Sequence, residues 1–161
     1  MTAPHMPTKR YDWARLNHLQ VGRYAEYLAK MEFAMFGFDI YTTEVDDKGI
    51  DFVVRNSSKE FHEVQVKSLR GTSGYVFMTK TSFTPAQRLH LVLVLLHQGQ
   101  PPAVYLIPSM EWLRAGRPSF LVDRTYGPAM KSAPEYGINV AAMHLAQLGG
   151  YAIERQLAAV T

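Results

Sequence analysis

The residues of this sequence that could do chemistry begin with two neighbouring apolar segments. In the second of these, Glu63, Gln65 and Lys67 alternate with valines, so a strand here would carry all three on one face. Asp51 begins the first segment. If the two segments pair as a hairpin around 56–58, a carboxylate, an amide oxygen and an ammonium group converge on that face.

A second carboxylate, that of Glu26, is predicted to join this group from a helix. Gly22 lies four residues before it, Ala29 three residues after it and Ala25 beside it, so Glu26 sits on a stripe of small residues. Such a stripe lets a helix approach a sheet closely. We therefore expect the acid to point inward.

Acids and a lysine held together in a partly desolvated pocket are costly unless something neutralises them. Mg²⁺ would do so, because it prefers oxygen ligands and binds through one or two carboxylates together with a substrate phosphate. Gln65 would supply an oxygen without adding charge, and Lys67 would orient or help to deprotonate a water. The expected chemistry is metal-assisted attack of water on a phosphodiester.

This arrangement resembles the PD-(D/E)XK nuclease superfamily, and within it the variants that carry Gln-x-Lys in place of Glu-x-Lys. Such variants occur in Mrr-type restriction endonucleases and in small bacterial nuclease-like domains. The resemblance covers about residues 16–83. It is carried by the stretches Val21–Glu26, Gly37–Tyr41, Asp46–Asp51 and Val64–Ser68.

The resemblance implies an α/β fold with a three-layer αβα, restriction-endonuclease-like core, in which helices flank a central mixed sheet. It implies that Asp51, the side-chain oxygen of Gln65 and the main-chain carbonyl of Val66 are metal ligands. Glu26 would act directly or through water. Lys67 would position the attacking water and stabilise the charge that develops on the phosphate. Gln65 departs from the acidic pattern and lowers the negative charge of the site.

We therefore expect a magnesium-dependent endonuclease that hydrolyses phosphodiester bonds. DNA is the expected substrate, with RNA as the second choice, and Mn²⁺ could substitute for Mg²⁺. The alternative is a nuclease-fold module that binds nucleic acid or a protein partner without cleaving, because fold does not fix function. A purely structural α/β subunit is a third, weaker interpretation. Little chain remains for a recognition domain, so we expect a recruiting partner, or a homodimer that cuts both strands.

The candidate residues also have structural interpretations. Glu63 and Lys67 could form a solvated ion pair on a strand face, and Asp51 could close the turn after Gly49. The acidic residues of 44–47 could add a metal ligand, although a solvated turn is the commoner use of such a cluster. The six histidines show no metal-ligand spacing, so none is assigned a role.

Further along the chain, aromatic and basic side chains offer contacts for nucleic acid, although core packing and solvation are their commoner uses. The rings that could stack on bases are Trp112, Tyr105 and Tyr126. The cations that could contact phosphates are Arg114, Arg117, Arg124 and Lys131, together with Arg70 in the turn after the Lys67 strand.

The elements that must position these residues follow from periodicity and turn signals. Residues 16–36 repeat apolar side chains at helical spacing, and Gly37 should end that helix. Four β-branched and aromatic stretches predict an antiparallel meander, at 38–43, 50–55, 61–69 and 75–83.

The second half of the chain predicts a mixed sheet. Thr84-Pro85 could begin a short helix, and two apolar runs, 91–96 and 104–107, are expected as strands buried on both faces. The remaining expectations are a short helix at 110–115 capped by Ser109, a long surface loop with at most one strand at 119–137, and a helical segment at 140–160 with a kink at Gly149-Gly150.

Length and composition set the outer limits. A chain of 161 residues suits one domain, which we place at 13–161 after a loose leader at 1–12. With 47% hydrophobic residues disorder is excluded, and a net charge of +3 is too small to indicate a histone-like binder, although it leaves room for one basic face. The lack of cysteine excludes disulfides and thiolate metal sites. No apolar run is long enough to span a membrane, so we expect a soluble, cytoplasmic protein.

Overall fold

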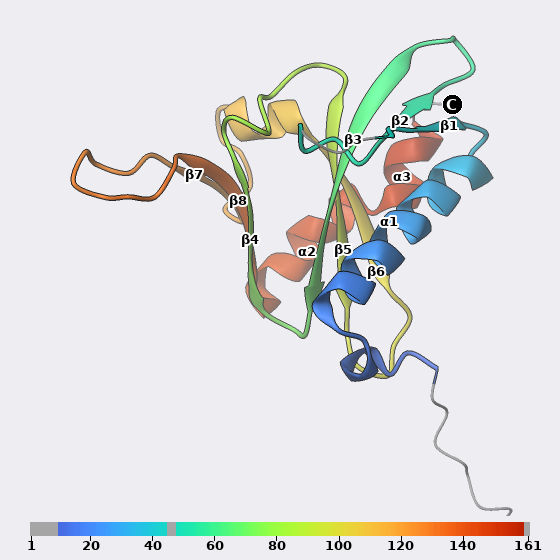
Figure 1. Ribbon diagram of the computed structural model, residues 1–161, viewed down its shortest axis with the longest axis horizontal. Coiled ribbons are helices and arrows are strands. Elements are labelled where there is room, and N and C mark those ends of the chain that lie inside the picture. The colour runs from blue at the N-terminus through green and yellow to red at the C-terminus, as the bar shows by residue number, and fades with distance from the viewer. Residues whose placement is uncertain (1–9, 45–47, 160–161) are drawn as a thin grey trace, which may run out of the picture.

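The structure is a computed structural model, and it describes residues 10–44 and 48–159. A five-stranded mixed sheet runs through its centre in the order β1-β2-β3-β5-β6 (Figure 1). These strands are β1 (Asp39–Thr42), β2 (Phe52–Arg55), β3 (Phe61–Arg70), β5 (Leu89–Leu96) and β6 (Ala103–Pro108). Only the β3–β5 pair is parallel in this sheet, since β1, β2 and β3 pair antiparallel and so do β5 and β6.

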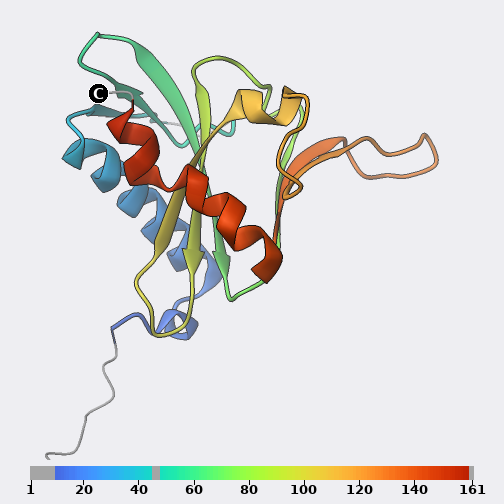
Figure 2. The same cartoon turned by 180° about the vertical axis from the view of Figure 1, so that it is seen from behind.

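Helices cover one face of this sheet. The long helix α1 (His18–Met35) and the short α3 (Ile153–Ala158) share a core with the residues of β2, β3 and β5 that point to the same side. The sheet residues in that core include Phe52, Val54, Val64, Val92 and Val94. Figure 2 shows α3 and the preceding α2 (Leu145–Leu148) crossing the back of the molecule, joined by η4 (Gly149–Tyr151).

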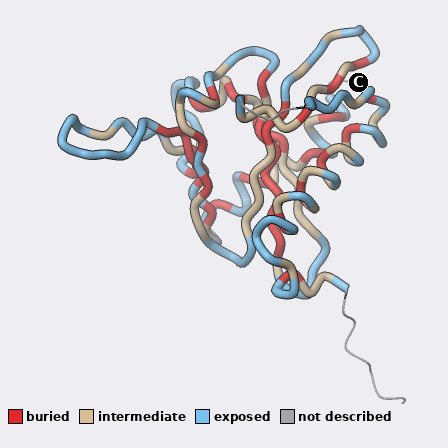
Figure 3. Tube along the Cα trace, in the orientation of Figure 1, coloured by how far each residue is buried: buried red, intermediate tan, exposed pale blue. Residues whose placement is uncertain are grey.

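A second, three-stranded antiparallel sheet covers part of the opposite face, in the order β4-β8-β7. Its strands are β4 (Gly74–Thr79), β7 (Leu121–Arg124) and β8 (Glu135–Val140). They form a second core with alternate residues of β5, with Trp112 from η2 (Ser109–Leu113) and with Leu148 from α2. Figure 3 shows the buried residues concentrated along β5 and the strands that face it.

Helix α1 spans His18–Met35, which is two residues shorter at its start and one at its end than the predicted 16–36. Asn17 and Gln20 form a reciprocal capping box, each side chain accepting a 2.9 Å hydrogen bond from the other residue's N–H. Gly37, with φ of +86°, ends the helix in a conformation that other residues rarely adopt. The helix buries one row of side chains spaced by four residues, which are Val21, Ala25, Ala29 and Phe33.

The predicted mixed sheet flanked by helices is confirmed, but the fourth strand of the predicted meander is wrong. β4 does not pair with β3 and instead joins β8 in the second sheet. β5 pairs with this edge of β3 instead. Because β5 is apolar on both faces, it is stable only at a central position in the sheet. A turn containing Gly71 and Gly74, both with positive φ, directs β4 away, and Val76 and Met78 enter the second core.

Three local predictions are also corrected. No helix begins at Thr84-Pro85. Ser109 is not an N-cap, because its buried hydroxyl donates to the Ala86 carbonyl at 2.8 Å and ties down that loop. The expected loop at 119–137 contains β7 and the start of β8, which is buried because it lies between β4 and β7. The break at Gly149-Gly150 is confirmed.

The predicted leader lies mostly outside the described residues. Asp12 accepts a 2.6 Å hydrogen bond from the Gln98 side chain, and Tyr11 packs on Trp13 in η1 (Trp13–Arg15). At the other end of the chain η3 (Ala142–His144) precedes α2. Among the described residues no helix has the length and apolar character needed to cross a membrane.

A histidine pair joins β3 to β5 on the helix-covered side of the sheet. His62 Nδ1 lies 3.0 Å from His90 Nε2, and the second nitrogen of each ring is buried without a hydrogen-bond partner among the described residues. Burial, together with the adjacent His62, lowers the pKa of His90 to about 4. Burial also lowers the pKa of His62. The fold therefore holds His90 neutral.

This pair predicts a loss of stability in acid. Because the pKa of His90 is lower in the folded state than the ordinary 6.5, the unfolded chain takes up a proton first as the pH falls. We expect the free energy of unfolding to be unaffected by this group above pH 6.5 and to fall by roughly 1–3 kcal/mol towards pH 4. Urea unfolding at a series of pH values measures this slope.

The variant His90→Gln keeps a polar atom near Nε2 but cannot titrate, so its slope should be shallower than that of the wild type. His18→Gln, at an exposed position of α1, serves as the control and should keep the wild-type slope. A His90→Gln variant with the wild-type slope would show that the pair does not cause the pH dependence.

Candidate functional site

Asp51 is attached directly to the middle of β3. Its N–H donates to the Val64 carbonyl at 3.0 Å, and its carboxylate Oδ2 accepts from the Val66 N–H at 2.5 Å. The β2–β3 pairing ends at Phe52 and Val64, and the two bonds of Asp51 reach the β3 main chain on either side of Gln65. The hairpin therefore brings Asp51 to the part of β3 that carries Gln65.

Gln65 carries the least satisfied polar atom of this region. The side chain is only 5% exposed, and its Oε1 is buried with no hydrogen-bond partner among the described residues. Gly49, with φ of +77°, allows the preceding segment to approach, since a Cβ there would lie 3.1 Å from Ser82 Cβ and 3.4 Å from Gln65 Nε2. A buried acceptor left unpaired costs about 1–3 kcal/mol, so this oxygen is suited to a cation or a donor that binds later.

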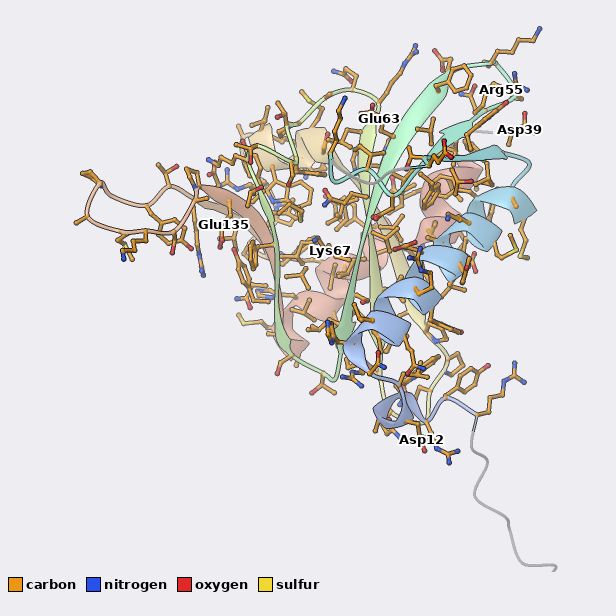
Figure 4. All side chains as sticks on the ribbon, in the orientation of Figure 1. Asp12, Asp39, Arg55, Glu63, Lys67 and Glu135 are labelled. Atoms are coloured by element: carbon orange, nitrogen blue, oxygen red, sulfur yellow. The ribbon has the colours of Figure 1, made fainter. Side chains whose placement is uncertain are left out.

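Lys67 is the next side chain on that face of β3. It is half-buried, and its ammonium group forms no ion pair or side-chain hydrogen bond within the described part of the chain. β3 and β4 diverge from their shared turn, and Lys67 lines a groove of about 350 Å³ between them. Figure 4 shows Lys67 on the side of β3 that faces β4. The groove gives an unpaired cation access to solvent.

Glu63, two residues before Gln65, is exposed. Among the described residues it forms no ion pair with Lys67, so the structural interpretation of a strand-face pair is not supported. The structural interpretation expected Asp51 to close the turn after Gly49. Its carboxylate instead accepts a hydrogen bond from the Val66 N–H on β3.

Glu26 lies on the other side of the sheet. α1 packs against the face of β3 that carries Val64 and Val66, and the Glu26 carboxylate forms a 2.7 Å ion pair with Arg23 one turn earlier. It lines a separate surface hollow with residues of the preceding two turns of the same helix, which are His18, Leu19, Gln20, Gly22 and Arg23. Only Ala25 and Ala29 of the small-residue stripe are buried, and a Cβ at Gly22 would meet open space.

The structure thus brings Asp51, Gln65, Val66 and Lys67 together, and it leaves Glu26 paired on the helix. Within the described residues no three His, Cys, Asp or Glu side chains gather closely enough to hold a metal ion. A carboxylate, an amide oxygen and main-chain oxygen remain as donors, and this set fits Mg²⁺, which keeps several waters. The unpartnered Gln65 oxygen is the observation that supports this fit. Asp46 and Asp47 lie outside the described residues.

Two hydroxyl groups of the site were missed by the sequence analysis. Thr79 and Ser82 line the groove with Lys67. Their oxygens lie 2.9 Å apart, and the Ser82 hydroxyl donates to the Thr79 carbonyl at 3.1 Å. The signal that could have found them is the polar run Thr79–Ser82 directly after a strand, because a polar turn follows the strand that borders the groove.

Several proposed nucleic-acid contacts prove to be structural. Arg70 donates to the carbonyls of Trp13 and Leu16, at 3.2 and 2.5 Å, and holds the start of the chain on the fold. Trp112 is fully buried and donates to the Gly137 carbonyl. Arg117 donates to main-chain oxygens in the same way. Trp112 is therefore not available to a ligand in this conformation, and Arg70 and Arg117, which are exposed, have part of their hydrogen-bonding capacity taken up by the main chain.

No protein-family model and no curated protein matches this sequence. Among solved structures the fold is similar to the bacterial homing endonuclease I-Ssp6803I, with 16% identity, a TM-score of 0.48, and coverage of 78% of this chain and 75% of that one. It is also similar to the Holliday junction resolvase Hjc of Archaeoglobus fulgidus, with 13% identity, a TM-score of 0.45, and coverage of 78% and 95%. Because both TM-scores lie below 0.5, we argue function from this chain's own residues.

The unpartnered oxygen predicts that Gln65 is held at a cost to stability. Replacing it with leucine, of similar size, removes a buried polar group that has no partner. We expect Gln65→Leu to raise the free energy of unfolding by roughly 1 kcal/mol in the presence of chelator. Urea unfolding of the wild type and the variant measures the difference.

Gln98→Leu is a suitable comparison, because both ends of the Gln98 amide form hydrogen bonds, to Ala14 and to Asp12. That variant should be less stable than the wild type. If Gln65→Leu also loses 1 kcal/mol or more, the Gln65 amide has a partner in the apo protein and is not held ready for a ligand.

Proposed function

We propose that this protein is a magnesium-dependent endonuclease that hydrolyses phosphodiester bonds in DNA. The observation that carries the proposal is the buried, unpartnered oxygen of Gln65 beside the Asp51 carboxylate, with the unpaired ammonium of Lys67 next to them at a groove. Gln65 and Lys67 lie on the paired strand β3, and Asp51, just before β2, is hydrogen-bonded to the β3 main chain, so the three residues are held in position.

The residues that would hold the ion are Asp51 and Gln65, with the main-chain carbonyl of Val66. When bound, Mg²⁺, or Mn²⁺ in its place, supplies Lewis-acid polarisation of the phosphodiester and neutralises the charge that develops on it. The Val66 N–H keeps the Asp51 carboxylate oriented through their 2.5 Å hydrogen bond. That bond keeps the carboxylate aligned before the substrate arrives.

In the reaction, the oxygen of a water forms a bond to phosphorus while the bond from phosphorus to the leaving oxygen breaks. The proton that the water loses is balanced by the proton that the leaving oxygen gains. Lys67 would orient the attacking water and stabilise the negative charge on the phosphate oxygens. The hydroxyls of Thr79 and Ser82 line the same groove and would contact the substrate backbone.

Glu26 would act through water rather than as a direct ligand, because its carboxylate is paired with Arg23 on the helix side of the sheet. A homodimer and a recruiting protein partner stay predictions.

The small number of acidic groups at the site favours a second candidate function. With Glu26 paired elsewhere and a neutral glutamine at position 65, the site holds fewer acidic groups than a metal-dependent nuclease commonly uses. A module that binds nucleic acid without cleaving it would retain the groove and Lys67 and would not need the ion.

A cleavage assay separates the two functions. Purified protein is incubated with supercoiled, linear and branched DNA and with RNA, in Mg²⁺, Mn²⁺ or chelator. We expect cleavage in the metal buffers alone and a loss of about 100-fold or more in Asp51→Asn and Lys67→Ala. A smaller loss is expected in Glu26→Gln because of its ion pair with Arg23.

Lys59→Ala is the matched control, since Lys59 is an exposed lysine in the turn before β3, far along the strand from Lys67. It should cleave like the wild type. Cleavage that survives both the chelator and the Lys67 substitution would contradict the metal mechanism. Binding that depends on salt, with no cleavage of any substrate, would favour the second function.

A further inference from the structure

The groove beside Lys67 also contains an exposed aromatic pair. Tyr75 and Phe77 line it from β4, with ring centroids 6.4 Å apart and ring planes 17° from parallel. Phe77 is 51% exposed, although its strand neighbours Val76 and Met78 are buried in the second core. Strand alternation thus presents both rings on the side of β4 away from that core.

Tyr75 is held rigidly, so the pair forms a fixed surface. Its hydroxyl donates to Glu135 at 2.7 Å, and the Arg124 guanidinium lies over its ring at 4.5 Å from the centroid. The ring also covers Gly137, where a Cβ would collide with it. A rigid ring that supports an exposed one can accept a flat ligand with little loss of side-chain entropy.

The charge around the rings suits an anionic ligand. Lys67 is a cation at the same groove, and its ammonium has no ionic partner among the described residues. Glu135, which contacts the Tyr75 hydroxyl, is buried and also lies 3.7 Å from the Arg124 guanidinium. The groove therefore offers one aromatic face and one cation to whatever enters it.

A nucleotide presents a flat base and a negative phosphate close together. In a duplex each base is stacked on both sides by its neighbours, so its face cannot reach a protein ring. Single strands, flaps and branch points expose such faces, and base–aromatic stacking tolerates any sequence.

We propose that Phe77, supported by Tyr75, stacks on an unpaired base of single-stranded or branched nucleic acid whose backbone lies at Lys67. This inference rests on the proposed function, because it names the substrate class of the same site. In this arrangement the aromatic side chains of β4 select unpaired over duplex nucleic acid, and Lys67 of β3 contacts the phosphate.

The test measures binding and not cleavage. The Kd of a fluorescent single-stranded oligonucleotide, and that of the duplex of the same sequence, are measured by anisotropy in chelator at low salt. We expect Phe77→Ala to weaken single-strand binding by about tenfold or more and duplex binding by less than about twofold. Phe77→Trp, which keeps a stacking face, should retain single-strand binding.

Phe61→Ala is the matched control. Phe61 is 49% exposed and lies at the opposite end of β3, six residues or about 20 Å from Lys67, so it loses similar apolar area outside the groove. It should bind both oligonucleotides like the wild type. Urea unfolding of each variant shows that the differences do not come from unfolding.

The inference is overturned if Phe77→Ala binds the single strand as tightly as the wild type does, if it weakens single-strand and duplex binding equally, or if Phe61→Ala has the same effect. Failure of the wild type to bind single strands also overturns it. Because the assay contains chelator, a protein that shows the Phe77 effect but never cleaves would keep this inference while the proposed endonuclease activity fails.

Discussion

The hydrogen bond from the Val66 N–H to the Asp51 carboxylate is the interaction on which the site depends. Asp51 lies one residue before β2 begins, and its carboxylate takes the place of a main-chain acceptor for β3. The bond is charge-assisted and short, at 2.5 Å, and it joins an acid to a strand that is itself paired on both edges. Asp51 therefore cannot move relative to β3 without breaking its two hydrogen bonds to Val64 and Val66.

The two faces of β3 have different roles, one in packing and one in the candidate site. Val64 and Val66 pack against α1 and stabilise the fold, and the opposite face carries polar groups that the core does not need. Gln65 is the clearest case, because a buried oxygen without a partner destabilises the protein and is expected where a ligand completes the site. The departure of β4 into a second sheet opens the groove that gives this face access to a substrate.

The sequence predicts those parts of the site that depend on local rules. Strand alternation places Gln65 and Lys67 on one face, and a short hairpin places Asp51 beside them. The orientation of Glu26 could not be predicted in this way, because Arg23, three residues earlier, competes for its carboxylate. Helical spacing shows that two side chains are neighbours and does not show which contact is preferred.

The larger errors arise from competition between distant segments. Whether β4 or β5 pairs with β3 depends on the burial of β5 on both faces, which involves residues from the whole chain. The strand β8 was not predicted, because the residues before it are typical of loops. In the structure it lies between β4 and β7 and is buried. The groove residues Thr79 and Ser82 were missed for the same reason, since they matter only once β4 has left the main sheet.

The central claim, that Asp51 and Gln65 hold a divalent cation, is tested most directly by the binding of Mn²⁺ in the absence of nucleic acid, measured by the electron paramagnetic resonance signal of the free ion. We predict one saturable Mn²⁺ site per chain, from which Mg²⁺ displaces the bound Mn²⁺. Asp39→Asn should retain this site, because Asp39 is exposed and paired with Arg55. The double variant Asp51→Asn with Gln65→Leu should abolish it. The account would be contradicted by an absence of saturable binding at millimolar Mn²⁺, or by a site that persists in the double variant.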